Sequence, residues 1–300
     1  MNNIFETANK LFNLAKSQHY ESHEYEAAQE NYGKAIENAE QLPADNFDYQ
    51  MILAELYENM AHLMNKCLNE QHKAHEYYEK ALNIMNEWYD KRDDLANNLE
   101  YMDKLAEANF NNSELMFVND YDIDYYGEET YYGFRDATCI WERMLKDKPD
   151  ITEKLLKCYF LSSDFYIYCG FNMKRIVINY KNAVKISESL AQNDPKFQDF
   201  LAYGYCKFSE FYQEIDENYE KAKRYFNKSI KIRELMPKDN ADFLNSLSSV
   251  YYKLADLEEE HLCNDKSAVM HYTLAVKYWE QMPENNLNYQ SDFAEAYYSL

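Results

Sequence analysis

Small and aromatic side chains recur along the chain at spacings of four and three residues. In "YEAAQENYGKAIENAEQLPADN" (residues 25–46), Ala28, Tyr32 and Ala35 follow this spacing, and the same pattern returns in "YEKAKRYFNKSIKIRELMPKDN" (219–240). Such spacings place the three side chains on one face of an α-helix. The small residues let a second helix approach closely, and the ring fills the space between the helices. The pattern therefore predicts helices that pack in pairs.

A second small residue marks an earlier helix in each pair, and it recurs at nearly constant intervals. Thirteen residues separate Ala15 from Ala28, and a proline follows Ala28 after fifteen more. Proline ends a helix, and the Asp or Asn after it can cap the next one. The unit is therefore a helix–turn–helix hairpin. Its markers are Ala15, Ala61, Ala106, Ser162, Ser209 and Ala255, at intervals of 46, 45, 56, 47 and 46 residues.

This hairpin resembles the tetratricopeptide repeat, which has an apolar-then-small pair in its first helix, then Ala-x3-aromatic-x2-Ala, then proline. The resemblance covers essentially the whole chain, with a period near 46 residues where the family has 34. HEAT and armadillo repeats have periods near this value, but they do not account for the Ala-x3-Tyr-x2-Ala register. The resemblance implies an all-α fold, a right-handed α-solenoid of helix–turn–helix repeats.

The markers predict a single array over residues 1–300. A chain that stops within a hairpin also favours further repeats or another module beyond Leu300. The expected repeats are 3–45, 46–92, 93–149, 150–195, 196–238 and 239–284, with a partial seventh first helix at 285–300.

The charge balance restricts the partners that this array could bind. The net charge is −22, and residues 1–150 carry 13 basic against 31 acidic residues, compared with 18 and 22 in the second half. Such acidity repels phosphate backbones and anionic lipid, so we expect neither nucleic acid nor membrane as a partner. The six cysteines form no CxxC pair and the N-terminus lacks a signal-peptide pattern, which favours a cytoplasmic location.

The third repeat carries extra acidic and tyrosine-rich sequence at 107–133. Insertions in repeat proteins map to loops, often on the binding face. Asp120, Asp122 and Asp124 suggest calcium, but an EF-hand loop needs Gly and Glu where Tyr125 and Tyr131 stand. A solvated acidic loop at 119–133 and a docking segment for a basic partner both remain open.

No catalytic, cofactor or metal site is expected from the motifs. His72 and His75 could share one helix face, as could His19 and His23, but two ligands make no site. Phosphate-binding loops, dinucleotide fingerprints and nucleophile elbows are missing from the sequence, so we do not expect an enzyme.

The tetratricopeptide resemblance implies that the first helices line a concave groove. That groove would be acidic and rich in tyrosine, which suits a Lys- or Arg-rich peptide or protein segment held by charge and aromatic packing. We therefore expect a protein-interaction scaffold. Alternatives are a regulatory part of a larger enzyme or signalling protein, and self-association through the basic second helix of the fifth repeat. The candidate partner-binding residues are Glu58, His62, Asp103, Glu107, Phe110, Asp120, Tyr121, Asp122, Asp124, Tyr125, Tyr159, Tyr166, Glu210, Tyr252, Asp256 and Glu259.

Overall fold

The structure of the chain is a computed structural model that describes residues 2–119, 123–170, 173–237, 241–282 and 290–300. Every regular element in these residues is a helix, which confirms the all-α prediction. Contacts between helices divide the chain into two compact units, Met1–Phe171 and Asn172–Leu300. The division of a single array into the predicted repeats stays a prediction.

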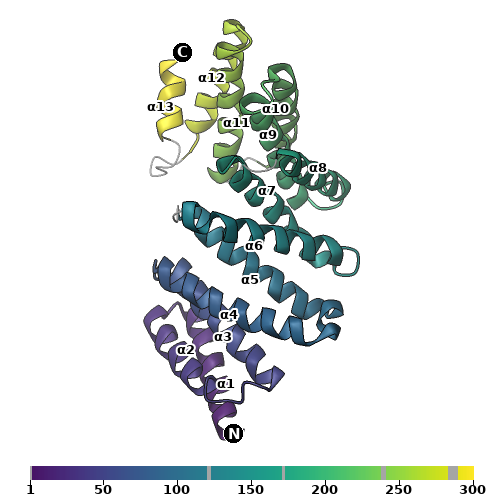
Figure 1. Cartoon of the computed structure of the whole chain (residues 1–300). Helices are drawn as coiled ribbons and strands as arrows, with labels where there is room; N and C mark the ends of the chain where they lie inside the picture. The colour runs from purple at the N-terminus through teal and green to yellow at the C-terminus, as the bar shows by residue number, and fades with distance from the viewer. Residues whose placement is uncertain (1, 120–122, 171–172, 238–240, 283–289) are drawn as a thin grey trace. The chain divides into compact units, whose positions relative to one another are not determined.

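The first unit contains three consecutive helical hairpins and one further helix, and Figure 1 shows the hairpins following one another from the purple N-terminus into the teal part of the chain. Each helix packs mainly against its sequence neighbour, and the first helices also contact each other, α1 with α3 and α5 with α7. The bounds are α1 Asn2–Ser17, η1 Gln18–Ser22, α2 Tyr25–Ala39, α3 Phe47–Lys66, α4 Gln71–Lys91, η2 Asp93–Asn97, α5 Leu99–Val118, α6 Ile123–Met144, η3 Pro149–Ile151 and α7 Thr152–Tyr168.

The second unit has the same helix-on-neighbour packing, drawn from green to yellow in Figure 1. Its last helix packs against both α12 and α11, in the region where a partial first helix is expected. The bounds are α8 Met173–Leu190, α9 Lys196–Glu214, α10 Tyr219–Arg233, α11 Ala241–Glu260, α12 Asp265–Trp279 and α13 Gln290–Tyr298.

The predicted small-residue positions form the core of the hairpins. All six markers are fully buried, and so are the second-helix residues Ala28, Ala74, Ala222 and Ala268. The rings at the central position, among them Tyr32, Phe226 and Trp141, are buried as well. A larger side chain at a marker would push two helices apart, so these residues set the helix–helix distance. The packing expected from the spacing is confirmed.

The turn that follows the marker helix also repeats. Five residues of the described chain have positive φ, and each lies eight positions after its marker: His23, Asn69, Gly170, Glu217 and Cys263. Left-handed backbone costs a non-glycine residue about 1 kcal/mol. This turn recurs in the structure but has no sequence signature, because only one of the five residues is glycine.

Tyrosine hydroxyls join one hairpin to the next. Tyr57 donates to Glu40 at 2.6 Å, and Tyr251 donates to Glu234 at 2.6 Å. In each pair the tyrosine follows the glutamate by 17 residues and lies in a first helix, while the glutamate ends the preceding second helix. Further pairs with this separation are Tyr159–Glu142 and Tyr205–Glu188. Four tyrosines of the described chain therefore serve this same contact between hairpins.

The described part of the insertion in the third hairpin is mainly helical, which corrects the expectation of a loop over 123–133. Helix α5 continues to Val118 and α6 begins at Ile123, so the extra residues lengthen both helices. Gly133 explains how the extension packs, because a Cβ there would lie 2.2 Å from Ser113 Oγ and 3.1 Å from Asn109 O. Added helix buries more apolar surface and satisfies its own backbone, whereas a loop of that length does neither.

Candidate partner-binding site

The first helices of the first unit form a cavity at the predicted binding face. The cavity has a volume of about 240 Å³ and lies between α3 and α5, with η1 at its edge. Three predicted site residues, Glu58, His62 and Glu107, are among the residues around it. The lining consists of Tyr20, Glu55, Glu58, Asn59, His62, Lys104, Glu107 and Asn111.

Glu58 is the unusual residue of this cavity. Its side chain is half-buried on α3, and within the described chain its carboxylate has neither a hydrogen bond nor an ion pair. Burial, followed by the negative charges of Glu107 and Glu55, raises the pKa of Glu58 to about 8. The site therefore holds a carboxyl group that would ionise readily only if a cation joined it.

The other acids of the cavity already have cations from the chain itself. Glu55 lies 3.4 Å from Lys16 Nζ and 3.5 Å from Lys104 Nζ, and Glu107 lies 2.8 Å from Lys154 Nζ. These lysines are partly exposed, so each pair contributes little to stability. They leave Glu58 as the acid that no basic side chain neutralises directly.

Tyr20 and His62 form the aromatic edge of the cavity, and the buried His19 packs against Tyr20. The Tyr20 hydroxyl donates to Asn59 Oδ1 at 3.1 Å, and the His19 ring stacks on Tyr20 with centroids 4.0 Å apart. His62 Nδ1 is buried and has no hydrogen-bond partner in the described chain. Burial, followed by the charge of Lys66, lowers the pKa of His62, and burial lowers that of His19 to about 4. Both rings are therefore neutral at pH 7, and the half-buried His62 ring is the one that lines the cavity.

Asp103, Tyr159 and Tyr166 are buried in the helix packing, and their predicted part in partner binding stays a prediction. Asp103 is 8% exposed and accepts hydrogen bonds from Trp141 Nε1 at 2.9 Å and Lys148 Nζ at 2.6 Å. Tyr159 and Tyr166 are 2% and 1% exposed. Helix period alone cannot separate a groove position from the seam beside it, because one residue of rotation decides which faces solvent.

Other predicted positions in the first unit either support the core or fall outside the described structure. Phe110 is half-buried and packs against Phe134 and Trp141, with centroids 6.1 and 5.8 Å apart. Asp120, Tyr121 and Asp122 lie outside the described residues, as do the side chains of Asp124 and Tyr125. Docking and calcium at this segment are therefore left as predictions.

In the second unit, the predicted acids are also held by neighbouring side chains. Glu210 lies 3.2 Å from Lys207 Nζ and also pairs with Lys253. The Tyr252 hydroxyl donates to Glu295 at 2.8 Å. The remaining two acids share one hydroxyl: Tyr272 OH lies 2.5 Å from Asp256 and 2.8 Å from Glu259.

The basic helix α10, predicted as a surface for self-association, uses much of its charge within its own unit. Arg233 is buried and contacts Asp199 at 3.0 Å, while Lys223 contacts Glu258 at 2.7 Å. Lys221 lies 4.3 Å from the centroid of the Tyr212 ring, and Lys228 lies 4.8 Å from that of Tyr205. These contacts reduce the positive charge available to an acidic surface of another copy.

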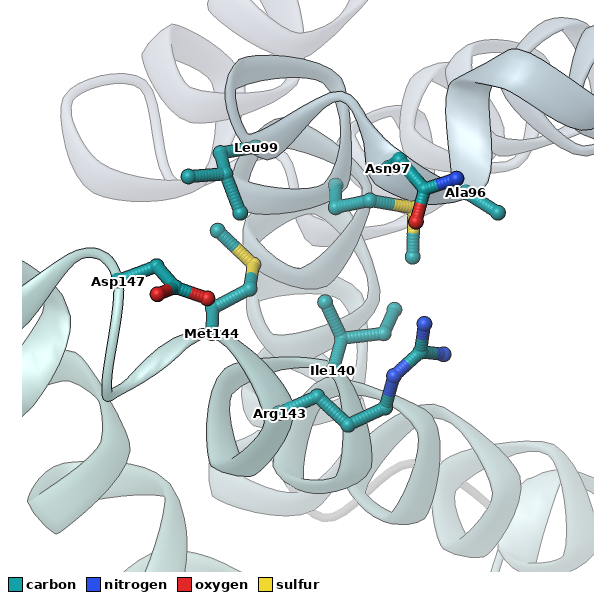
Figure 2. Close-up of a pocket in the computed structure, with 8 residues that line it drawn as sticks. Ala96, Asn97, Leu99, Ile140, Arg143, Met144 and Asp147 are labelled. Atoms are coloured by element: carbon teal, nitrogen blue, oxygen red, sulfur yellow. The ribbon is translucent and has the colours of Figure 1, made fainter.

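A second cavity of about 240 Å³ lies at the start of α5 and the end of α6, and Figure 2 shows its lining. Leu99, Ile140 and Met144 project into it, whereas the guanidinium of Arg143 lies at one side and the Asp147 carboxylate at the other. Arg143 and a single acid, Asp147, line this hollow, so it does not match the basic partner predicted for the groove.

Sequence reasoning missed several residues of the Glu58 cavity, notably Tyr20, Glu55 and Lys104. Glu55 lies one turn before Glu58 on α3, and Lys104 lies one turn before Glu107 on α5. Candidate positions extended by one turn toward the N-terminus of each first helix would have included both Glu55 and Lys104. Tyr20 gave no such signal, because it lies in the irregular turn η1 that follows α1.

No model of a known protein family matches the chain, and no curated protein matches it in sequence. Solved structures with a similar fold include BtubC (BKLC) from P. vanneervenii, 20% identical with a TM-score of 0.55 over 79% of this chain and 86% of that one. The S. pombe nuclear import adaptor Nro1 is 15% identical, with a TM-score of 0.55 over 99% of both chains. The apo form of RapI is 13% identical, with a TM-score of 0.50 over 98% of this chain and 84% of that one.

Two statements about the whole chain follow from the helices and these comparisons. None of the described helices is both long and apolar enough to cross a membrane. At identities of 20% or less the likeness extends to the fold alone. The chain therefore has the fold of α-helical repeat proteins.

Proposed function

We propose that the chain is a protein-interaction scaffold and that its first unit binds a Lys- or Arg-rich polypeptide segment at the Glu58 cavity. The observation that carries this proposal is the carboxyl group of Glu58, which is half-buried and has no cation of its own. A buried carboxyl without a partner is costly when ionised. A cationic side chain from a partner would remove that cost.

A lysine or arginine entering the cavity would meet complementary groups on several sides. Its charge would pair with Glu58 and lie near Glu55 and Glu107, while the Tyr20 ring offers a cation–π surface. Asn59 and Asn111 supply amide groups that can accept hydrogen bonds from a guanidinium or ammonium. The cavity therefore suits one anchoring basic residue of a longer segment.

The charge of the surrounding sequence favours the same class of partner. The first 150 residues carry far more acidic than basic side chains, so their field attracts a basic segment and accelerates its encounter with the cavity. The same field opposes polyanions such as nucleic acid. Nro1, a nuclear import adaptor, supports the proposal only by analogy, because it shows a similar fold serving as an adaptor.

Binding to an array of Lys- and Arg-rich peptides tests the proposal, with an array of Asp- and Glu-rich peptides of equal length for comparison. We expect the chain to select basic peptides and Glu58→Gln to weaken their binding about 30-fold or more, because truncating one partner of a buried charge pair costs about 2–5 kcal/mol. Glu26→Gln removes the same charge from an exposed position on α2 and serves as the matched control.

Two results would contradict the proposal. The first is a chain that binds no basic peptide better than the acidic set. The second is that Glu58→Gln and Glu26→Gln weaken peptide binding equally. Net charge alone would then explain the loss of affinity, and the cavity would have no role.

A further inference from the structure

We propose that α4, α5 and α6 form a binding site for a divalent transition-metal ion, with His75, Glu79 and Glu129 as the protein ligands. One ligand atom from each residue lies within 4.8 Å of the other two. His75 and Glu79 are one turn apart on α4, and Glu129 comes from α6. This site shares no residue with the Glu58 cavity and does not depend on the proposed partner binding.

A buried amide, that of Asn112, orients the histidine ligand. His75 Nδ1 lies 2.9 Å from Asn112 Oδ1, and because an amide oxygen only accepts, the imidazole proton is on Nδ1. Nε2 then carries the lone pair, and it lies 3.8 Å from Glu79 Oε2. Metal-binding histidines are oriented by such a hydrogen bond from the second ring nitrogen.

The same amide holds the third ligand. Asn112 Nδ2 donates to Glu129 Oε1 at 3.2 Å, so one side chain of α5, only 4% exposed, connects a ligand of α4 with a ligand of α6. The Tyr126 ring packs edge-on against His75, with centroids 5.2 Å apart and planes at 80°. These contacts fix the imidazole and the carboxylate before any ion arrives, which is the arrangement of a preformed site.

The surroundings favour a cation and leave room for water. The carboxylates of Glu79 and Glu129 both lie beside the His75 imidazole and supply negative charge to a bound cation. Glu79, Asn112 and Glu129 also line a cavity of about 300 Å³ that continues past Gly133 and Asp136. That space can hold the water ligands that a site with three protein ligands requires.

The ligand set selects the class of ion. One imidazole and two carboxylates suit zinc or a neighbouring first-row divalent ion, whereas calcium and magnesium prefer oxygen ligands alone. Tetrahedral bonds of about 2.0 Å place neighbouring ligand atoms about 3.3 Å apart. The separation of 3.8 Å between His75 Nε2 and Glu79 Oε2 therefore needs only a small side-chain adjustment. The exposed Glu79 is free to make it.

Calorimetric titration of the full 300-residue chain with zinc chloride tests the site. Glu79→Gln and Glu129→Gln each replace an exposed carboxylate by a neutral group of the same shape. Glu76→Gln and Glu128→Gln change the adjacent residue on each helix, both exposed, and serve as matched controls. We expect each ligand variant to weaken one zinc site at least tenfold and the controls to bind like the unsubstituted chain.

A thermal shift separates this site from zinc bound by the six free cysteines. Zinc should raise the melting temperature of the unsubstituted chain and both controls, and should raise it less in Glu79→Gln and Glu129→Gln. Circular dichroism checks that the variants fold. The proposal is wrong if all five proteins give the same zinc isotherm, or if zinc leaves the melting temperature of the unsubstituted chain unchanged.

Discussion

A carboxyl group that is removed from water and gains no cation keeps its proton to higher pH. Glu58 is such a group, because burial and neighbouring acids raise its pKa to about 8. Its neighbours Glu55 and Glu107 are equally acidic, but lysines of the same unit reach them. The difference between a paired and an unpaired acid is set by contacts over some 40 to 50 residues of sequence. No local pattern in the sequence records it.

The stability of the chain should reveal Glu58 through its pH dependence. In the unfolded chain the group ionises near pH 4.5, whereas its pKa is about 8 in the folded chain. The folded state therefore retains a proton between these values, and this contribution to stability is lost as pH rises toward 8. Glu58→Gln, which has no such group, should match the unsubstituted chain at pH 4 and exceed it at pH 9 by up to about 4–5 kcal/mol, which corresponds to the full difference between the two pKa values.

Urea unfolding of both proteins at several pH values measures this difference, because their other titrating groups cancel. Glu26→Gln, on the surface of α2, should show no such trend. A constant difference between Glu58→Gln and the unsubstituted chain from pH 4 to 9 would contradict the account of Glu58.

The tyrosine–glutamate pairs between hairpins give a second test at the residue scale. Tyr251→Phe keeps the buried ring but removes the hydroxyl that donates to Glu234 at 2.6 Å. A hydrogen bond to a charged acceptor contributes about 1.5–3 kcal/mol, so unfolding in urea should show a loss near the lower end. Tyr297→Phe removes a hydroxyl from an exposed ring and should be neutral. Equal effects would mean that the hydroxyl–carboxylate pair does not stabilise the array.

At the scale of single elements, much could be predicted because the information is local. Ala-x3-Tyr-x2-Ala places three side chains on one face within two turns, and the structure buries all of them at Ala28, Tyr32 and Ala35. Asn46, expected to cap a helix after Pro43, accepts a hydrogen bond from the Tyr49 amide at 3.1 Å. Helix period and capping chemistry therefore define the hairpins without knowledge of distant residues.

The third hairpin shows why the rest could not be predicted. Acidic residues, tyrosines and two glycines between 120 and 133 suggest a loop, yet α6 runs through 123–133. Gly133 lies where α6 meets α5, so its small size serves a close approach and not a turn. Propensity within the segment cannot reveal a packing partner on another helix.

Two glycine substitutions test this interpretation in opposite directions. Gly133→Ala places a Cβ 3.1 Å from the backbone oxygen of Asn109 and 2.2 Å from Ser113 Oγ, so we expect a loss of about 1–3 kcal/mol from overpacking. Gly33→Ala, within α2 and with nothing inside 4 Å, should gain about 0.5–1 kcal/mol from helix propensity. Chemical denaturation measures the free energy of unfolding of both variants. An increase in that free energy at both positions would show that α5 and α6 do not approach closely at Gly133.

At the scale of the whole molecule, repetition is the property that the sequence expresses most strongly. The markers, the left-handed turns eight residues later and the tyrosine–glutamate pairs return in both units. Less of the function could be predicted, because the repeated residues form the helix packing and not the binding site. The acidity of the binding face depends on which carboxylates have no lysine or arginine partner in the folded chain. The charge asymmetry nevertheless indicated the first half of the chain, where the Glu58 cavity lies.

The most direct measurement is the number of protons released when a selected Lys- or Arg-rich peptide binds at pH 7. Calorimetry in buffers of different ionisation enthalpy yields this number. Glu58 is mostly protonated at pH 7 in the free chain, so pairing with a cation should expel close to one proton. Glu58→Gln should release almost none. Tight binding with no proton release from the unsubstituted chain would contradict the central claim that Glu58 receives the basic side chain.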